Sequence, residues 1–307
     1  MQINNATLFF AGALRQVGKR IRLRGWERML RALFHPDKQR HVAFRIPFNG
    51  FTYPAYADNI VDWNALFYGT YETFELKLLA AIADSIKGAV FVDAGANVGH
   101  HALYMAAHAR RVHAFEPNPA LWPLIEEKIS INSLDNLTLH RCGLGSKACQ
   151  LPLYLGPESG EASLFAGASR TSLSTSIPAT IVQGDDYFRQ AGIDRLELIK
   201  MDIEGFEKHA IEGMSACLDT WRPVMMIEIS EIGKEEFGNF TSFVQAFPEG
   251  YAFYFCQLGS SIIIRTALEP ANETAYVDFV GNVFCIPKER ECLFKELVGD
   301  TATVGMP

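Results

Sequence analysis

The stretch Val90-Phe-Val-Asp-Ala-Gly-Ala-Asn-Val-Gly99 decides the fold of this chain of 307 residues. It opens with β-branched and aromatic apolar residues, which are typical of a buried strand. Gly95 and Gly99 then break the apolar run, and an alanine-rich segment at 101–108 indicates a helix. A strand, a glycine loop and a helix in this order place backbone N–H groups and a helix N-terminus against a nucleotide-like ligand.

The residues of the loop distinguish between two ligands. Dinucleotide-binding loops read G-x-G-x-x-G, which admits a pyrophosphate, whereas this loop reads D-x-G-x-N-x-G, with Asp93, Gly95, Asn97 and Gly99. The Asp93 carboxylate would repel a pyrophosphate but could help to hold a cationic ammonium, directly or through water. S-adenosylmethionine carries that ammonium and has no phosphate, so we expect it here. An ordinary turn with glycines for geometry alone is the alternative.

A second strand is expected to begin at Arg111 and to end in Glu116, followed by Pro117 and Pro119. A carboxylate at the tip of the second strand, about 20 residues past the glycine loop, can accept both ribose hydroxyls of a bound nucleoside. The alternative is that Glu116 only begins a helix, although Pro119 already supplies that signal.

Three motifs in order resemble the FkbM-type family of S-adenosylmethionine-dependent methyltransferases: D-x-G-A-N-x-G at 93–99, A-F-E-P-N-P at 114–119 and K-M-D-I-E-G at 200–205. The resemblance runs over about residues 59–287. It implies an α/β, Rossmann-like class I methyltransferase fold, with a seven-stranded mixed sheet and helices on both faces. It also implies that the backbone around Cys142 and Gly143 flanks the adenine. Hydroxyls on sugars or polyketide-type natural products are the implied acceptors.

The third motif ends the expected fourth strand and is the best place for catalysis. On an extended strand Lys200, Asp202 and Glu204 share one face. Asp202 is the first candidate for catalysis or acceptor positioning, and Glu204 is the second. Glu204 could instead be a carboxylate at the N-terminus of the following helix. For Lys200 we expect an ion pair with one of these acids.

Three further residues are candidates for the substrate side. Glu72 ends a G-x-Y-E element before the first core helix, where a helix N-terminal role is the alternative. His100 begins the helix after the glycine loop, and Glu228 ends the expected fifth strand. Asp202, Glu204 and Glu228 are hard oxygen ligands that suit Mg²⁺ or Ca²⁺. They would be a thin set of ligands for an ion that must also leave room for substrate. A divalent metal is thus possible, but metal-free catalysis is favoured and no metal ligand is assigned.

The charge and composition of the chain limit the classes of molecule that it is expected to bind. The net charge of −7 argues against a general nucleic-acid binder. Residues 1–50 carry ten Lys/Arg against two acidic residues, a net of +8, which leaves −15 for the rest. Residues 14–34 mix apolar and basic side chains, which predicts either peripheral contact with an anionic membrane or a packed helix with a solvated basic face. Six cysteines without metal-binding spacing indicate free thiols. Without a secretory signal or a spanning apolar run, we expect a cytoplasmic protein, with a peripheral position at the membrane as the alternative.

We therefore expect a basic helical extension at 1–58 with a hairpin or irregular strands at 41–57, a methyltransferase domain at 59–290 and a tail at 291–307. An inserted hairpin region at 146–183 is expected to carry a loop at about 156–176. The favoured activity is O-methyl transfer by in-line displacement to a small-molecule or glycan hydroxyl. The alternatives are a nicotinamide-dependent (NAD) oxidoreductase of Rossmann type, which the glycine spacing disfavours, and a non-catalytic cofactor- or membrane-binding module.

Overall fold

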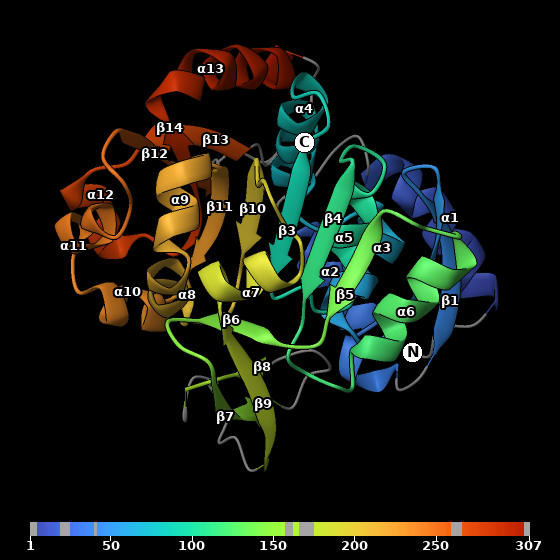
Figure 1. Ribbon diagram of the computed structural model, residues 1–307. Helices are drawn as coiled ribbons and strands as arrows, with labels where there is room; N and C mark the ends of the chain where they lie inside the picture. Colours follow the sequence, from blue (N-terminus) through green and yellow to red (C-terminus); the bar gives the residue numbers. More distant parts are fainter. Residues whose placement is uncertain are drawn as a thin grey trace.

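The structure is a computed structural model of the chain and describes residues 5–18, 25–39, 42–156, 162–165, 175–258 and 266–303. Within these ranges the centre of the molecule is a mixed sheet of eight strands (Figure 1). The strands are β3 (Val90–Ala94), β4 (Arg111–Phe115), β5 (Leu137–His140), β10 (Leu198–Met201), β11 (Val224–Ile229), β12 (Tyr251–Leu258), β13 (Thr266–Pro270) and β14 (Gly281–Pro287). Their order is β13-β12-β14-β11-β10-β3-β4-β5. The strands from β11 to β5 are parallel, and β14 is antiparallel to both of its neighbours.

This sheet has one strand more than the seven that the sequence predicted. β13 pairs in antiparallel with β12 and forms the edge of the sheet. Its residues are exposed or only half-buried, so the alternation that marks a strand in a sequence is weak here. The Rossmann-like α/β class and the helices on both faces are confirmed.

Helices cover two separate cores, one on each face of the sheet. Side chains alternate along a strand, so Val90 and Val92 of β3 pack in one core and Phe91 in the other. The first core lies under α7 (Gly184–Gln190), α8 (Glu207–Gly213), α9 (Ser215–Trp221), α10 (Glu231–Phe237), α11 (Phe240–Gln245) and α12 (Glu273–Asp278). The second lies under α4 (Thr73–Ser85), α5 (His100–Met105), α6 (Trp122–Ile131) and α13 (Lys288–Thr303). The expected tail at 291–307 is thus, where described, a packed helix.

The inserted segment forms a sheet of its own. Its strands are β6 (Gly143–Gly145), β7 (Cys149–Leu155), β8 (Ala162–Ser163) and β9 (Thr175–Gln183), in the order β6-β9-β7-β8. β7 and β9 pair in antiparallel, which confirms the predicted hairpin. Of the loop expected at 156–176, residues 157–161 and 166–174 lie outside the described residues. In Figure 1 this small sheet projects from the carboxyl ends of β3, β4 and β10.

The N-terminal extension packs as a third core. It contains α1 (Asn5–Gly18), α2 (Trp26–Leu33), a 3₁₀ turn at Pro36–Lys38, β1 (Ala43–Phe48), β2 (Phe51–Tyr56) and α3 (Ile60–Tyr68). β1 and β2 form an antiparallel hairpin rather than irregular strands. Tyr53 and Trp63 are buried in this core together with Leu103 of α5, so the extension is joined to the main domain. By packing, α3 belongs with the extension and not with the domain expected to start at residue 59.

Candidate active site

The loop between β3 and α5 is fixed by close backbone contacts to both neighbouring strands. The N–H groups of Gly95 and Ala96 each donate to the carbonyl oxygen of Phe115 at 3.0 Å. Gly95 has a φ of +76°, and a Cβ atom there would lie 1.9 Å from the carbonyl oxygen of Asp202. Position 95 therefore requires glycine both for the backbone conformation and for the close approach of the chain after β10.

Glu116, directly after β4, is turned back onto this loop. Its Oε2 accepts a hydrogen bond from the N–H of Asn97 and its Oε1 one from the N–H of Asn118, both at 2.8 Å. Burial raises the pKa of Glu116 to about 7. The second glycine of the loop, Gly99, is the residue directly before α5. A Cβ atom added at Gly99 would lie 3.1 Å from Ile125 of α6, and Gly99 caps the start of α5 with a left-handed backbone, at a φ of +76°.

A pocket opens over the loop, and we call it the glycine-loop pocket. It is lined by Gly95, Asn97, Glu116, Pro117, Gly143, Leu144, Leu153, Ala162, Ser163, Leu164, Asp202, Ile203, Glu204 and Phe206. Six of the residues predicted from sequence meet here, from elements far apart in the chain: Gly95, Asn97, Glu116, Gly143, Asp202 and Glu204. Cys142 lies in the core beside Gly143, where burial raises the pKa of its thiol to about 11.

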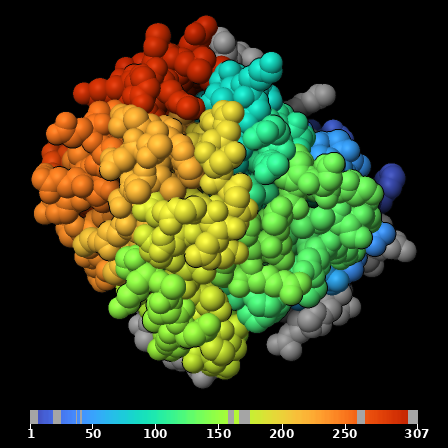
Figure 2. Space-filling model, in the orientation of Figure 1, coloured from blue at the N-terminus to red at the C-terminus, as the bar shows by residue number. Residues whose placement is uncertain are grey.

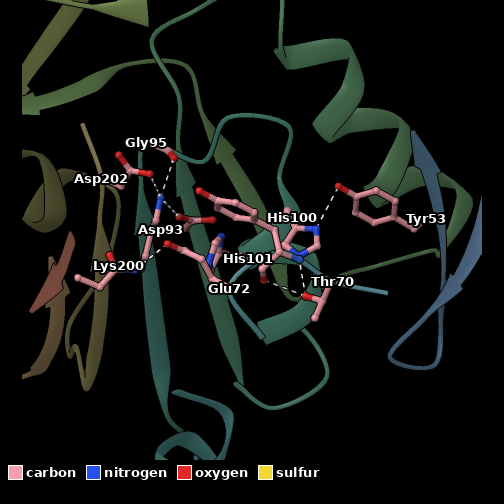
Figure 3. Close-up of polar contacts among 11 residues, drawn as sticks. Tyr53, Thr70, Glu72, Asp93, Gly95, His100, His101, Lys200 and Asp202 are labelled. Carbon is pink, nitrogen blue, oxygen red and sulfur yellow. Dashed lines mark hydrogen bonds and ion pairs between the residues drawn. The ribbon is translucent and has the colours of Figure 1, made fainter. Parts of the chain in front are cut away.

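Lys200 connects the ends of β3 and β10 (Figure 3). Its Nζ lies 3.1 Å from the carbonyl oxygen of Gly95, 3.3 Å from Asp202 Oδ2 and 3.7 Å from Asp93 Oδ1. Burial raises the pKa of Asp93, whose side chain is fully enclosed. The ammonium beside Asp93 is thus that of Lys200. Asp93 was expected to contact the cofactor, but it is not among the residues that line the glycine-loop pocket.

Asp202 and Glu228 form a hydrogen-bonded carboxyl pair at the ends of β10 and β11. Burial alone would raise the pKa of Asp202, but the Lys200 ammonium and the hydrogen bonds from Glu228 and Lys200 lower it below its usual value. Repulsion from Asp202, and then burial, raises the pKa of Glu228 to about 11. The two pKa values are thus shifted in opposite directions, which favours an ionised Asp202 beside a protonated Glu228.

Glu228 also lines a second pocket, on the other side of the pair, which we call the Glu72 pocket. It is lined by Gly18, Asn64, Tyr68, Thr70, Tyr71, Glu72, Thr73, Phe74, Glu75, Glu228, Cys256, Leu258, Thr266, Val280, Gly281 and Asn282. Glu72 has a left-handed backbone, with a φ of +49°. Its Oε1 accepts a hydrogen bond from Asn282 Nδ2 at 2.6 Å. His101 Nε2 lies 3.0 Å from its Oε2 (Figure 3). Asn282 was not predicted from sequence, because an asparagine in a strand carries no functional signal.

Within the described residues no group of three or more His, Cys, Asp or Glu side chains is arranged to hold a metal ion. None of the described helices combines the length and the apolar character needed to cross a bilayer.

Comparison with known proteins identifies the family. A family model described as the methyltransferase FkbM domain matches residues 93–255, which is more than half of the chain. The chain belongs to the FkbM methyltransferase family. The match contains the glycine loop, Glu116 and the Lys200–Glu204 motif, on which the resemblance rested. Membership in this family supports methyl transfer over the hydride transfer considered from the sequence.

Relatives in this methyltransferase family are distant. Methyltransferase sdnD of Sordaria araneosa is 25% identical over 183 residues, 46% of this chain and 70% of that protein. The hexuronic acid methyltransferase AglP of Haloferax volcanii is 27% identical over 131 residues, 43% of this chain and 52% of that protein. A solved FkbM methyltransferase from Methylobacillus flagellatus has a TM-score of 0.42 at 17% identity, covering 64% of this chain and 43% of that chain.

His100 lies behind the site rather than in it (Figure 3). The Tyr71 N–H donates to its Nε2 at 3.1 Å, and Thr70 Oγ1 lies 2.9 Å from the same nitrogen. Its Nδ1 lies 3.2 Å from the hydroxyl of Tyr53, which donates to Asp62 at 2.6 Å. Burial lowers the pKa of His100 well below its usual value. The ring is thus neutral and occupied at both nitrogens, so the predicted contact with substrate is wrong. His100 instead holds the loop that precedes Glu72.

The prediction that Glu204 shares a strand face with Lys200 and Asp202 is wrong. β10 ends at Met201, and Glu204 is an exposed residue with a φ of +55°. The two-residue alternation of a strand therefore stops before it reaches Glu204. Glu204 still lines the glycine-loop pocket, but on its outer side.

A residue that was not predicted, Glu207, braces this turn. Its buried Oε1 accepts hydrogen bonds from the N–H groups of Ile203 at 3.0 Å and Gly205 at 3.2 Å. Burial raises the pKa of Glu207 to about 7. A carboxylate in the first turn of a helix is the sequence signal that could have indicated this role.

Proposed function

We propose that this FkbM-family methyltransferase uses S-adenosylmethionine to methylate a hydroxyl of a sugar or of a polyketide-type natural product. The proposal is carried by the Asp202–Glu228 pair, which stands between the two pockets. Asp202 lines the glycine-loop pocket and Glu228 lines the Glu72 pocket. A base positioned between a cofactor pocket and an acceptor pocket is the arrangement that methyl transfer to a hydroxyl requires.

The glycine-loop pocket fits S-adenosylmethionine. Its described lining contains three carboxylates, Glu116, Asp202 and Glu204, and neither lysine nor arginine. That charge suits a cationic ligand without phosphates and opposes a dinucleotide. Glu116 would accept hydrogen bonds from the ribose hydroxyls, and Leu144 and Phe206 offer apolar surface to the adenine. When bound, this cofactor supplies a methyl group on a positively charged sulfur.

Asp202 would take the proton from the acceptor. The hydroxyl oxygen forms its bond to the methyl carbon as the bond between sulfur and that carbon breaks. The hydroxyl becomes strongly acidic as the new bond forms, so a carboxylate of low pKa is a sufficient base. Lys200 keeps Asp202 ionised for this purpose. The protonated Glu228 carboxyl donates its hydrogen bond to Asp202, and its carbonyl oxygen could accept a hydrogen bond from a hydroxyl of the acceptor.

The Glu72 pocket supports a hydroxyl-bearing acceptor. Glu72 and Glu75 can accept hydrogen bonds from hydroxyls, and Asn282 can both donate and accept. The name of one relative supports a sugar acceptor, since AglP is named a hexuronic acid methyltransferase. Bound there, a hydroxyl would lie next to the Asp202–Glu228 pair.

Asp202→Asn tests the proposal. We expect turnover to fall by about 10²–10⁴-fold, the usual contribution of a positioned general base, while affinity for S-adenosylhomocysteine stays nearly unchanged. Methyl transfer to a panel of glycosides and hydroxylated polyketides would measure the first effect, and calorimetry the second. Asp186→Asn is the matched control, because Asp186 lies exposed on α7 and pairs only with Arg189. An active Asp202→Asn enzyme would remove Asp202 from this role.

A further inference from the structure

The N-terminal helices expose an unusual amount of apolar surface. Ten large hydrophobic side chains are exposed among the described residues, and half of them lie on α1 and α2. On α1 these are Phe9 (80% exposed), Phe10 (67%) and Val17 (51%), and on α2 they are Met29 (45%) and Leu33 (49%). An apolar cluster of this kind on a folded domain usually marks a binding surface.

α1 is apolar on both of its sides. One side, with Thr7, Ala11 and Gly18, is buried against the extension. The outer side carries Phe9, Phe10, Ala13 and Val17, positions that repeat at the spacing of one helix face, with Gln16 as its one polar residue among those described as exposed. The helix contains no acidic residue, and Arg15 is its one charged residue. A helix that is apolar on every side is normally buried. We therefore expect another molecule or surface to cover the outer face of α1.

The positive charge of the N-terminal residues indicates which kind of surface would cover α1 and α2. The first 50 residues carry a net charge of +8 within a chain of net −7. On α2 the exposed Arg28 lies beside Met29 and is followed one turn later by Ala32 and Leu33, which are exposed as well. A second copy of the chain would bring the same positive charge against itself. An anionic bilayer accepts both features, because apolar side chains enter the boundary between headgroups and acyl chains while basic residues meet lipid headgroups.

We propose that the outer faces of α1 and α2 dock this enzyme on the surface of an anionic lipid bilayer. α1 has 14 residues and is therefore about 21 Å long, too short to span a bilayer but suited to lie in its surface. Gly18, the last residue of α1, lines the Glu72 pocket together with the exposed Leu258 and Val280. A docked α1 therefore ends at that pocket. The docking itself does not depend on the proposed reaction.

Flotation of the full-length chain with vesicles tests the docking. We expect binding to vesicles of phosphatidylcholine mixed with phosphatidylglycerol, little binding to pure phosphatidylcholine, and weaker binding as salt rises. The double substitution Phe9→Ser with Phe10→Ser should weaken binding at least tenfold. Val277→Ser is the matched control, because Val277 is 66% exposed on α12, which lies at the opposite edge of the molecule from α1 (Figures 1 and 2).

A second pair of substitutions, Met29→Ser with Leu33→Ser on α2, should also weaken binding and keeps the test valid if the α1 variant misfolds. Circular dichroism melting identifies a misfolded variant. Wild-type binding by both double variants would overturn the proposal. A second result would also overturn it: the wild-type chain does not bind anionic vesicles, but it forms a dimer in size-exclusion chromatography and the α1 variant does not. The outer faces of α1 and α2 would then bind a second copy of the chain.

Discussion

Replacing Gly95 by alanine tests whether the glycine loop and the Asp202 turn form one rigid unit. The added Cβ would lie 1.9 Å from the carbonyl oxygen of Asp202 and 3.0 Å from Ile203 Cγ2. The nearest atom belongs to the backbone, so no side-chain rotation relieves the clash and the chain at Asp202 must move. Gly192 is the matched control, because it has a similar φ of +69° and nothing lies within 4 Å of its added Cβ.

The two variants separate the cost of backbone conformation from the cost of the clash. Gly192→Ala should lose about 1–2 kcal/mol of unfolding free energy, the penalty for placing Cβ on a left-handed backbone. Gly95→Ala carries the same penalty plus about 1–3 kcal/mol for forcing atoms into a packed region. We therefore expect a total loss of about 2–5 kcal/mol for Gly95→Ala. At about 2–4 °C per kcal/mol for domains of 150–250 residues, the two Tm values should be clearly resolved.

Thermal and urea denaturation would measure stability, and calorimetry with S-adenosylhomocysteine would measure the site. Gly95→Ala should lose affinity as well as stability, because Gly95 and Asp202 both line the glycine-loop pocket. Gly192→Ala should lose stability alone. Equal stability of the two variants, with unchanged affinity in both, would refute the close-approach argument.

Three further predictions concern the cofactor and the acceptor. Because burial raises the pKa of Glu116 to about 7, its ionised form is lost as pH falls through that value. Affinity for S-adenosylhomocysteine should then fall by up to about tenfold per pH unit below 7, and calorimetry of Glu116→Gln should show a flat profile. Neutral glycosides should be methylated faster than the matching hexuronic acids, because Glu72 and Glu75 line the Glu72 pocket, where we propose that the acceptor binds; a preference for the acids, measured as kcat/KM, would contradict this. Turnover should survive EDTA, because the Lys200 ammonium already lies 3.3 Å from Asp202 and would repel a divalent ion; loss of activity restored by Mg²⁺ would show otherwise.

The cofactor side of the site could be predicted from sequence because its parts are local. The pattern of a buried strand followed by glycines predicted the positions of Gly95 and Asn97, and the expected end of the next strand predicted the position of Glu116. Parallel strands present their carboxyl ends at one edge of a sheet, so these residues meet whatever the details of the loops. The failures lie where local rules stop, as at Glu204, which lies in a turn with a left-handed backbone, three residues after β10 ends at Met201.

The Glu72 pocket, the proposed acceptor site, could not be predicted in the same way, because it is assembled from distant segments. Glu72 is held by Asn282, 210 residues away, and by His101. His100 is buried because Tyr53 of the N-terminal hairpin reaches it, which no spacing around His100 reveals. Such contacts depend on how the three cores pack together, and a sequence pattern records only what lies within one strand or helix.

Lys200 shows why residue type alone does not assign catalytic roles. In the sequence Asp93, Asp202 and Glu228 are equivalent, since each is an acid near the end of a parallel strand. Register pairing of β10 with β3 sets Lys200 opposite Asp93, which brings its ammonium to 3.7 Å from Asp93 and 3.3 Å from Asp202. The ammonium of Lys200 lowers the pKa of the nearer Asp202, and the charge of Asp202 raises the pKa of Glu228. In the proposed reaction, one ammonium thus gives two similar carboxyl groups the separate roles of base and hydrogen-bond donor, because their environments differ.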